Sequence, residues 1–130
     1  MAWYAVAGTL LVTGVAWLVA DRIKTSPAPV IWQQSAATLL MVHGGAAMLA
    51  LLLLGALAQV HVQRAWRSRR NRISGVAMVV INSILVLTAF GLYYSGSDVV
   101  RSWISDLHTG CGLFLPLLVA VHVLIGRRSR

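Results

Sequence analysis

The chain alternates between long apolar runs and short polar connections. Four apolar runs cover about residues 1–20, 35–63, 73–94 and 100–126. A helix needs about 20 apolar residues to cross a bilayer, and each run supplies them. The pattern predicts an all-α integral membrane protein in which residues 1–130 form a single bundle of four transmembrane helices. No Lys or Arg precedes the first run, so we interpret it as a membrane helix rather than a signal peptide.

The composition excludes a water-soluble globule. Apolar residues make up 58% of the chain and charged residues only 11%, whereas a soluble domain carries about 25% charged residues. The mean hydropathy of +0.79 excludes a disordered chain, because disorder requires low hydrophobicity. The longest connection, Asp21–Gln34, is too short for a nucleotide-binding or flavin-binding domain. We therefore expect any chemistry to take place among the helices.

The distribution of charge predicts the topology. A net charge of +8 arises from 11 Lys and Arg residues against three Asp. The connection at 64–72 and the tail at 127–130 hold eight arginines and no acid, while the three Asp residues flank the other two connections. The positive-inside rule then predicts that both termini lie in the cytoplasm. Anionic headgroups account for the basic residues, so we expect membrane lipid, and not nucleic acid, as a partner.

All four histidines fall within the second and fourth apolar runs. His43 and His61 share one helix face and are separated by about 27 Å along the axis, at a rise of about 1.5 Å per residue. His108 and His122 again share one face and are separated by about 21 Å. Ionisable residues inside a membrane span are costly and point to function.

The depths of the histidines match in two pairs, because the second and fourth helices are expected to be antiparallel. His43 and His108 lie toward the outer side of the membrane. His61 and His122 lie close to the cytoplasmic arginines. Two imidazoles that face each other across a bundle can provide the two axial ligands of a haem iron. We therefore predict that His43 and His108 bind the iron of an outer haem, and that His61 and His122 bind the iron of an inner haem.

Other residue types complete the predicted site. Small residues beside the ligands, Gly44 and Gly112 among them, leave space for a flat porphyrin, although small residues also allow close helix packing. Pro116 is expected to kink the last helix. Arg64 and Arg101 are candidates to neutralise haem propionates at the two membrane faces. We interpret the remaining candidate ligands as packing residues, namely Met41, Met48, Met78 and Cys111.

The segments from His43-Gly44-Gly45 to His61, and from His108-Thr109-Gly110-Cys111-Gly112-Leu113-Phe114 to His122, carry a family resemblance. Over residues 35–128 the sequence resembles the bacterial dihaem b-type membrane cytochromes, a cytochrome b561-like four-helix group. The resemblance implies two non-covalent haems b and electron transfer across the bacterial inner membrane. It also implies exchange with a quinone, ubiquinone or menaquinone, and with a redox protein such as a periplasmic cytochrome or a dehydrogenase subunit. With a single Cys and no Cys-x-x-Cys-His motif, covalent haem attachment is excluded.

Three alternative interpretations remain open. The chain could be a haem-containing anchor subunit of a larger oxidoreductase, and whether it is a quinol-linked enzyme in its own right is undecided. It could be a small four-helix transporter without haem, although no Asp or Glu lies deep in the spans, where proton-coupled exporters need a carboxylate. A zinc or copper site fits less well, because ligand pairs at opposite depths suit two planar cofactors better than one tetrahedral cluster.

Overall fold

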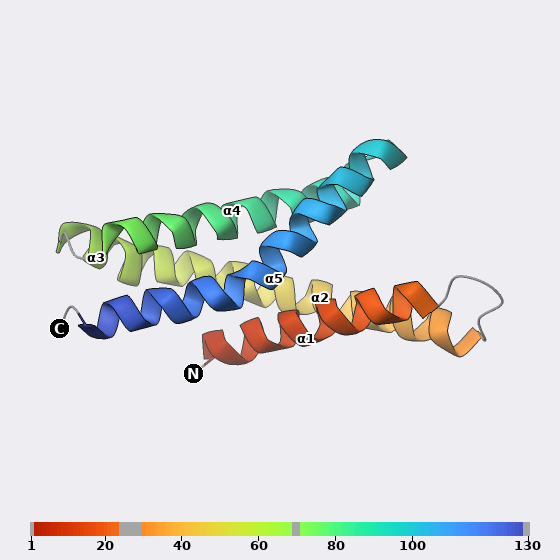
Figure 1. The fold of residues 1–130 in the computed structure, drawn as a ribbon, viewed down its shortest axis with the longest axis horizontal. Coiled ribbons are helices and arrows are strands. Elements are labelled where there is room, and N and C mark those ends of the chain that lie inside the picture. Colours follow the sequence, from red (N-terminus) through yellow and green to blue (C-terminus); the bar gives the residue numbers. More distant parts are fainter. Residues whose placement is uncertain (1, 24–29, 69–70, 129–130) are drawn as a thin grey trace. The chain divides into compact units, whose positions relative to one another are not determined.

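The structure, a computed structural model, describes residues 2–23, 30–68 and 71–128. Its helical elements are α1 (Ala2–Ile23), α2 (Val30–Leu57), the π-helical turn η1 (Ala58–Val62), α3 (Gln63–Arg67), α4 (Arg72–Tyr94) and α5 (Asp98–Arg128) (Figure 1). These residues contain no strand. The predicted all-α class is therefore confirmed over the described part of the chain.

Each predicted span has a helical counterpart, but the helices are longer than the apolar runs. The second span continues without a break from Val30 through η1 to the end of α3 at Arg67. The last helix already begins at Asp98 and ends at Arg128. Polar residues at these ends do not interrupt a helix, since Gln, Arg and Ser all tolerate helical geometry. The break expected at Pro27–Pro29 lies outside the described residues.

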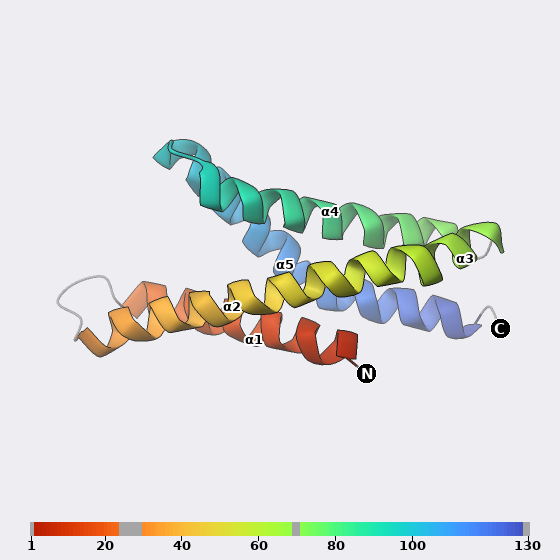
Figure 2. The same cartoon turned by 180° about the vertical axis from the view of Figure 1, so that it is seen from behind.

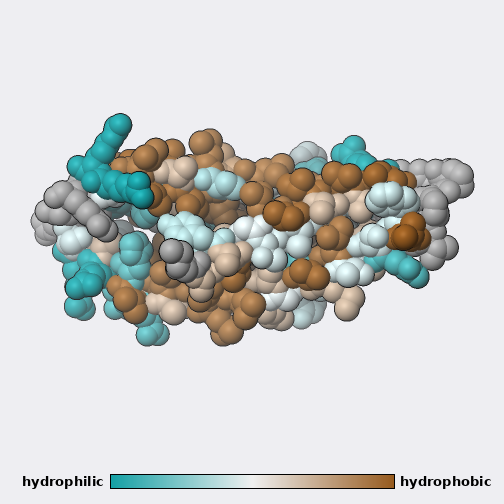
Figure 3. All heavy atoms as spheres, turned by 90° about the horizontal axis from the view of Figure 1, so that it is seen from below, coloured by the Kyte–Doolittle hydropathy of each residue, from teal (hydrophilic) through white to brown (hydrophobic). Residues whose placement is uncertain are grey.

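Four helices are long and apolar enough to cross a membrane, spanning Ala2–Ile23, Ile31–Arg67, Arg72–Tyr94 and Asp98–Arg128. Most of their large apolar side chains are exposed, and the buried hydrophobic residues are all alanines. Figure 3 shows apolar side chains along the helices and the most hydrophilic ones toward the helix ends. Such a surface is suited to lipid rather than to water.

The contacts divide the chain into two compact units, Met1–Ala58 and Gln59–Arg130. In the first unit, α1 packs along α2. Small side chains allow this close approach, because Ala20 and Ala36 are both buried. In the second unit, α4 and α5 form a helical hairpin closed by a turn at Ser95–Ser97. This turn lies where the sequence predicts it.

Helix α5 contains Pro116 in its interior. Figures 1 and 2 show that its ribbon changes direction in the middle, which agrees with the expected kink. A proline removes a backbone hydrogen bond and clashes with the preceding turn, so the helix bends around it.

The π turn η1 is a feature that the sequence pattern does not predict. It lies within the long second span, at Ala58–Val62, where the helix continues with π instead of α geometry, and it contains His61. A π turn closes its hydrogen bonds over one more residue than an α turn, so it changes the angular position of the residues it contains. The uniform α-helical rotation used to place His43 and His61 on one face therefore does not apply across this turn.

Candidate functional site

Two of the four predicted haem ligands lie against each other in the second unit. The ring of His61, in η1, and the ring of His122, in α5, have centroids 6.2 Å apart and planes inclined at 78°. His61 is exposed and His122 is half-buried. The structure thus brings together the pair that the sequence predicts for the cytoplasmic side.

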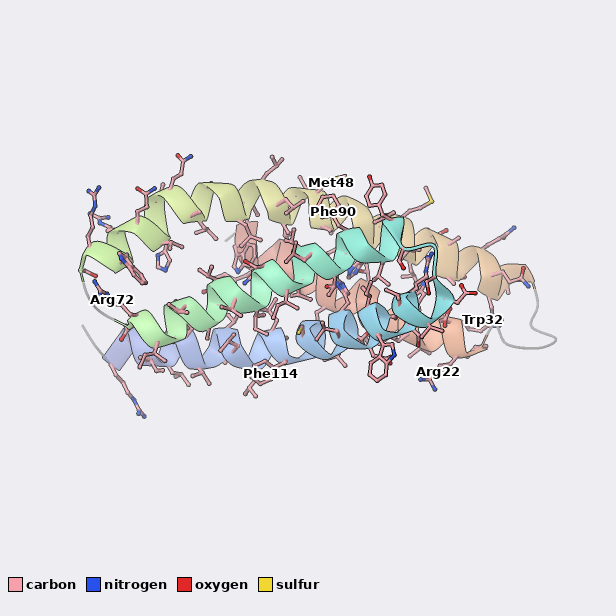
Figure 4. All side chains as sticks on the ribbon, turned by 90° about the horizontal axis from the view of Figure 1, so that it is seen from above. Arg22, Trp32, Met48, Arg72, Phe90 and Phe114 are labelled. Atoms are coloured by element: carbon pink, nitrogen blue, oxygen red, sulfur yellow. The ribbon has the colours of Figure 1, made fainter. Side chains whose placement is uncertain are left out.

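The connection between α3 and α4 lies on the same side as this pair. Arg72, labelled in Figure 4, places its guanidinium 4.8 Å from the centre of the Trp66 ring. Arg72 Nη2 also donates to the Trp66 carbonyl oxygen over 3.0 Å. Asn71 adopts the left-handed backbone conformation, with φ 52°, where α4 begins. These contacts tie α3, which directly follows the His61 turn, to the start of α4.

His122 is also in contact with α4. Its Nδ1 lies 3.1 Å from the hydroxyl oxygen of Ser74, and that hydroxyl donates to the Asn71 carbonyl over 3.2 Å. Ser74 is among the few buried residues of the described chain. One side of the imidazole ring is therefore held by a polar group inside the α4–α5 hairpin.

His108 makes the same kind of contact further along the hairpin. Its Nδ1 lies 2.8 Å from Thr88 Oγ1. The separation of Ser74 from Thr88 along α4 equals the separation of His108 from His122 along α5. Because the helices are antiparallel, equal spacings allow both hydroxyl–imidazole contacts to form at once.

His43 repeats the arrangement in the first unit. Its Nδ1 lies 3.0 Å from Thr13 Oγ1 on α1. Gly14 lies beside the ring, and a Cβ added at this glycine would stand 3.3 Å from His43 Cε1. Two turns away along each helix, the buried Ala20 and Ala36 occupy matching positions of the same antiparallel register.

The predicted outer pair joins residues of different units, since His43 belongs to the first and His108 to the second. Their pairing stays a prediction. Both histidines lie deeper within their helices than the sequence predicts, because α2 already begins at Val30 and α5 at Asp98. The apolar runs from which these helices are predicted begin further along the chain, at about residues 35 and 100.

The other predicted site residues have varied surroundings. Gly44 and Gly112 are half-buried, and a Cβ at Gly112 would meet Leu85 of α4 at an ordinary 3.9 Å. Arg64, in α3, and Arg101, in α5, are exposed. The residues interpreted as packing are exposed or half-buried, namely Met41 and Met48 (exposed), and Met78 and Cys111 (half-buried).

None of the three hydroxyl partners, Thr13, Ser74 and Thr88, is among the site residues predicted from the sequence. Thr88 belongs to a polar stripe on its helix, together with Asn82 and Ser83. The signal for Ser74 was present in the sequence, because its separation from Thr88 equals the spacing of the two histidines on the last helix. No comparable spacing identifies Thr13.

Within residues 2–23, 30–68 and 71–128, no three His, Cys, Asp or Glu side chains gather as a metal centre. The candidate site therefore consists of paired or single imidazoles, each in contact with a neighbouring helix or ring. Compared with family models, curated proteins and solved structures, the chain matches none of them.

Proposed function

We propose that the chain is a multi-pass membrane cytochrome that carries electrons across a bilayer through two non-covalent haems b. Each haem is held by two histidines, His61 with His122 and His43 with His108. The proposal is supported chiefly by the placement of His61 and His122, whose ring centres lie 6.2 Å apart in an edge-to-face arrangement.

The spacing of this pair leaves room for one metal ion between the two rings. Since metal–imidazole bonds are about 2.0 Å long, two imidazoles that bound the same ion would have ring centres about 6 Å apart. The observed centroid separation is 6.2 Å. The planes of the two rings are inclined at 78°. The residues present thus fit the group.

Bound at such a pair, a haem iron would take up and release single electrons. The contribution of the chain is to hold both imidazoles firmly, and the contact between His122 and Ser74 restricts one of them. Arg64, three residues after His61, is placed to pair with a propionate at the cytoplasmic end. Arg101 has the corresponding role near the start of α5. Exposed apolar helix faces keep water away from the middle of the path.

The donor and acceptor are a membrane quinone, ubiquinone or menaquinone, and a redox protein such as a periplasmic cytochrome or a dehydrogenase subunit. Next to His61, the helix surface has a shallow, open hollow lined by Val62, Gln63, Trp66 and Arg67. The chain lies in the bacterial inner membrane with both termini in the cytoplasm, as the arginine distribution favours.

A pyridine haemochrome assay on the purified full chain tests this function. We expect two haems b per chain and a spectrum that dithionite reduces. The matched control is a variant in which all four histidines are replaced by Ala, which should bind none. Zero haem in the unmodified chain would refute the function, and one haem would refute the two-site path. Oxidation of a quinol analogue by the loaded chain would distinguish an active electron carrier from a passive anchor subunit.

A further inference from the structure

Three hydroxyl groups in the described part of the chain share an arrangement that the electron-transfer proposal does not require. Each belongs to a buried residue, with exposed fractions of 7% for Thr13, 8% for Ser74 and 7% for Thr88. Each lies within 3.1 Å of the Nδ1 atom of a histidine on the neighbouring helix. These are the only buried polar residues among those described.

The single proton of each hydroxyl has a second acceptor. Thr13 Oγ1 donates to the Thr9 carbonyl over 2.6 Å, and Thr88 Oγ1 donates to the Ile84 carbonyl over 2.7 Å. Ser74 donates to a carbonyl over a longer 3.2 Å. Such bonds to the preceding turn are the usual arrangement for Ser and Thr in apolar helices.

The direction of the hydroxyl–imidazole bond follows from this count. A hydroxyl has one proton and two lone pairs, so a hydroxyl that donates to a carbonyl can only accept from a second partner. The short carbonyl bonds of Thr13 and Thr88 therefore favour a donating Nδ1–H in His43 and His108, and His43 has the Leu10 backbone as a further hydrogen-bond partner. The Ser74 hydroxyl lies at similar distances from the Asn71 carbonyl and from His122 Nδ1, and we infer the same direction for that contact. In a neutral ring the lone pair therefore lies on Nε2.

We propose that each of these hydroxyls is a positioning group that fixes its histidine as the Nδ1–H tautomer and presents Nε2 as the ligating atom. Metal-ligating histidines usually donate their other ring N–H to a fixed acceptor, which sets both the tautomer and the ring orientation. The positioning role rests on the proposed haem function, whereas the tautomer itself does not.

The tautomers can be measured without haem. The full chain, labelled with 15N in its histidine rings and purified in detergent micelles without haem, is examined by NMR at a pH where the rings are neutral. The 15N chemical shift of each ring nitrogen shows whether it carries a proton or a lone pair. Single His→Gln variants assign each signal to its histidine. We expect His43, His108 and His122 to carry their protons on Nδ1. Protons on Nε2 in these rings would overturn the proposal.

Thr88→Val tests the cause, because valine keeps the shape of threonine and removes the hydroxyl. We expect the ratio of the two His108 tautomers to change about fivefold, as the loss of one hydrogen bond implies, with His43 unchanged. Thr88→Ser should restore the Nδ1–H form. Thr9→Val is the matched control, since the Thr9 hydroxyl is exposed and bonds only the Ala5 carbonyl in the described structure. An unchanged His108 in Thr88→Val would refute the positioning role.

If the Thr88→Val variant does not fold, the positioning role can still be tested with a second variant. Circular dichroism reveals the loss of helix, and Ser74→Ala with His122 as its reporter then gives the same comparison at the other contact. Haem binding is measured separately on the same chain. Nδ1 protonation without haem affinity would refute the haem function alone, and haem affinity with Nε2 protonation would refute the tautomer alone.

Discussion

Thr88 Oγ1 lies 2.8 Å from His108 Nδ1, the shortest of the three contacts between a hydroxyl and an imidazole. The two residues come from opposite helices of the α4–α5 hairpin, and Thr88 is buried between them. A polar pair of this kind satisfies both partners inside an apolar helix pair, where an unpaired imidazole N–H would be costly. The contact therefore stabilises the hairpin whatever cofactor the chain binds.

The stability of the hairpin should decrease when this contact is removed. We expect Thr88→Val to lower the free energy of unfolding by about 1 kcal/mol, since interhelical hydrogen bonds in membranes contribute about that much. Denaturant unfolding in detergent, followed by circular dichroism, measures the change. Thr88→Ser should retain most of the stability, and equal losses in both variants would show that the methyl group matters rather than the hydroxyl.

Haem content in paired histidine variants tests which residues share an iron. Replacing His43, His108 or both by Ala should leave the same single haem, because either ligand alone is insufficient. His61 and His122 should behave in the same way at the other site. The combination of His43→Ala with His122→Ala should remove both haems. Retention of one haem in that variant, with none in His43→Ala/His108→Ala, would contradict the proposed pairing.

Gly14 should not tolerate a side chain, because the His43 ring lies beside it, whereas Gly8 on the same helix has open space around it. An alanine Cβ at position 14 would stand 3.3 Å from His43 Cε1, so the ring must shift by a few tenths of an ångström. Gly14→Ala should therefore weaken the Thr13–His43 contact and lower haem occupancy at the site that includes His43. Gly8→Ala is the control, because nothing lies within 4 Å of its added Cβ. Equal haem content in the two variants would argue against this contact.

The arginine distribution gives a prediction that is independent of haem. A reporter fused after Arg130 should lie in the cytoplasm, and a reporter inserted at Pro27–Pro29 should lie in the periplasm. Alkaline phosphatase and green fluorescent protein fusions measure the two cases. The reverse pattern would exchange the inner and outer assignments of both histidine pairs.

The sequence predicted the helices well and the side-chain partners poorly, for different physical reasons. Apolar runs of membrane length identify spans directly, and histidine is conspicuous among them. Thr13 could not be recognised, because it looks the same in sequence as Thr38, whose hydroxyl bonds only its own helix in the described structure. Which hydroxyl meets an imidazole depends on helix rotation, and hydropathy does not determine rotation where lipid surrounds the chain.

The π turn was equally hidden. The segment Ala58–Val62 contains neither proline nor glycine, and its apolar and polar residues are compatible with an ordinary α-helix. Its presence matters because it contains His61 and because π turns are frequent at functional sites. The spacing of histidines in the sequence therefore predicts their positions along the helix axis more reliably than the helix face on which they lie.

The equal spacings of the hydroxyls on α4 and the histidines on α5 also select one alignment of these helices during assembly. Apolar helices in lipid can slide along each other with little change in contact energy, because lipid tails and leucine side chains are equally apolar. A slip of one turn, about 5.4 Å, would place His108 opposite Ile84 or Leu92 and would separate His122 from Ser74 at the same time. Both bonds are thus lost together, so the α4–α5 hairpin has a single preferred register rather than a series of nearly equivalent ones.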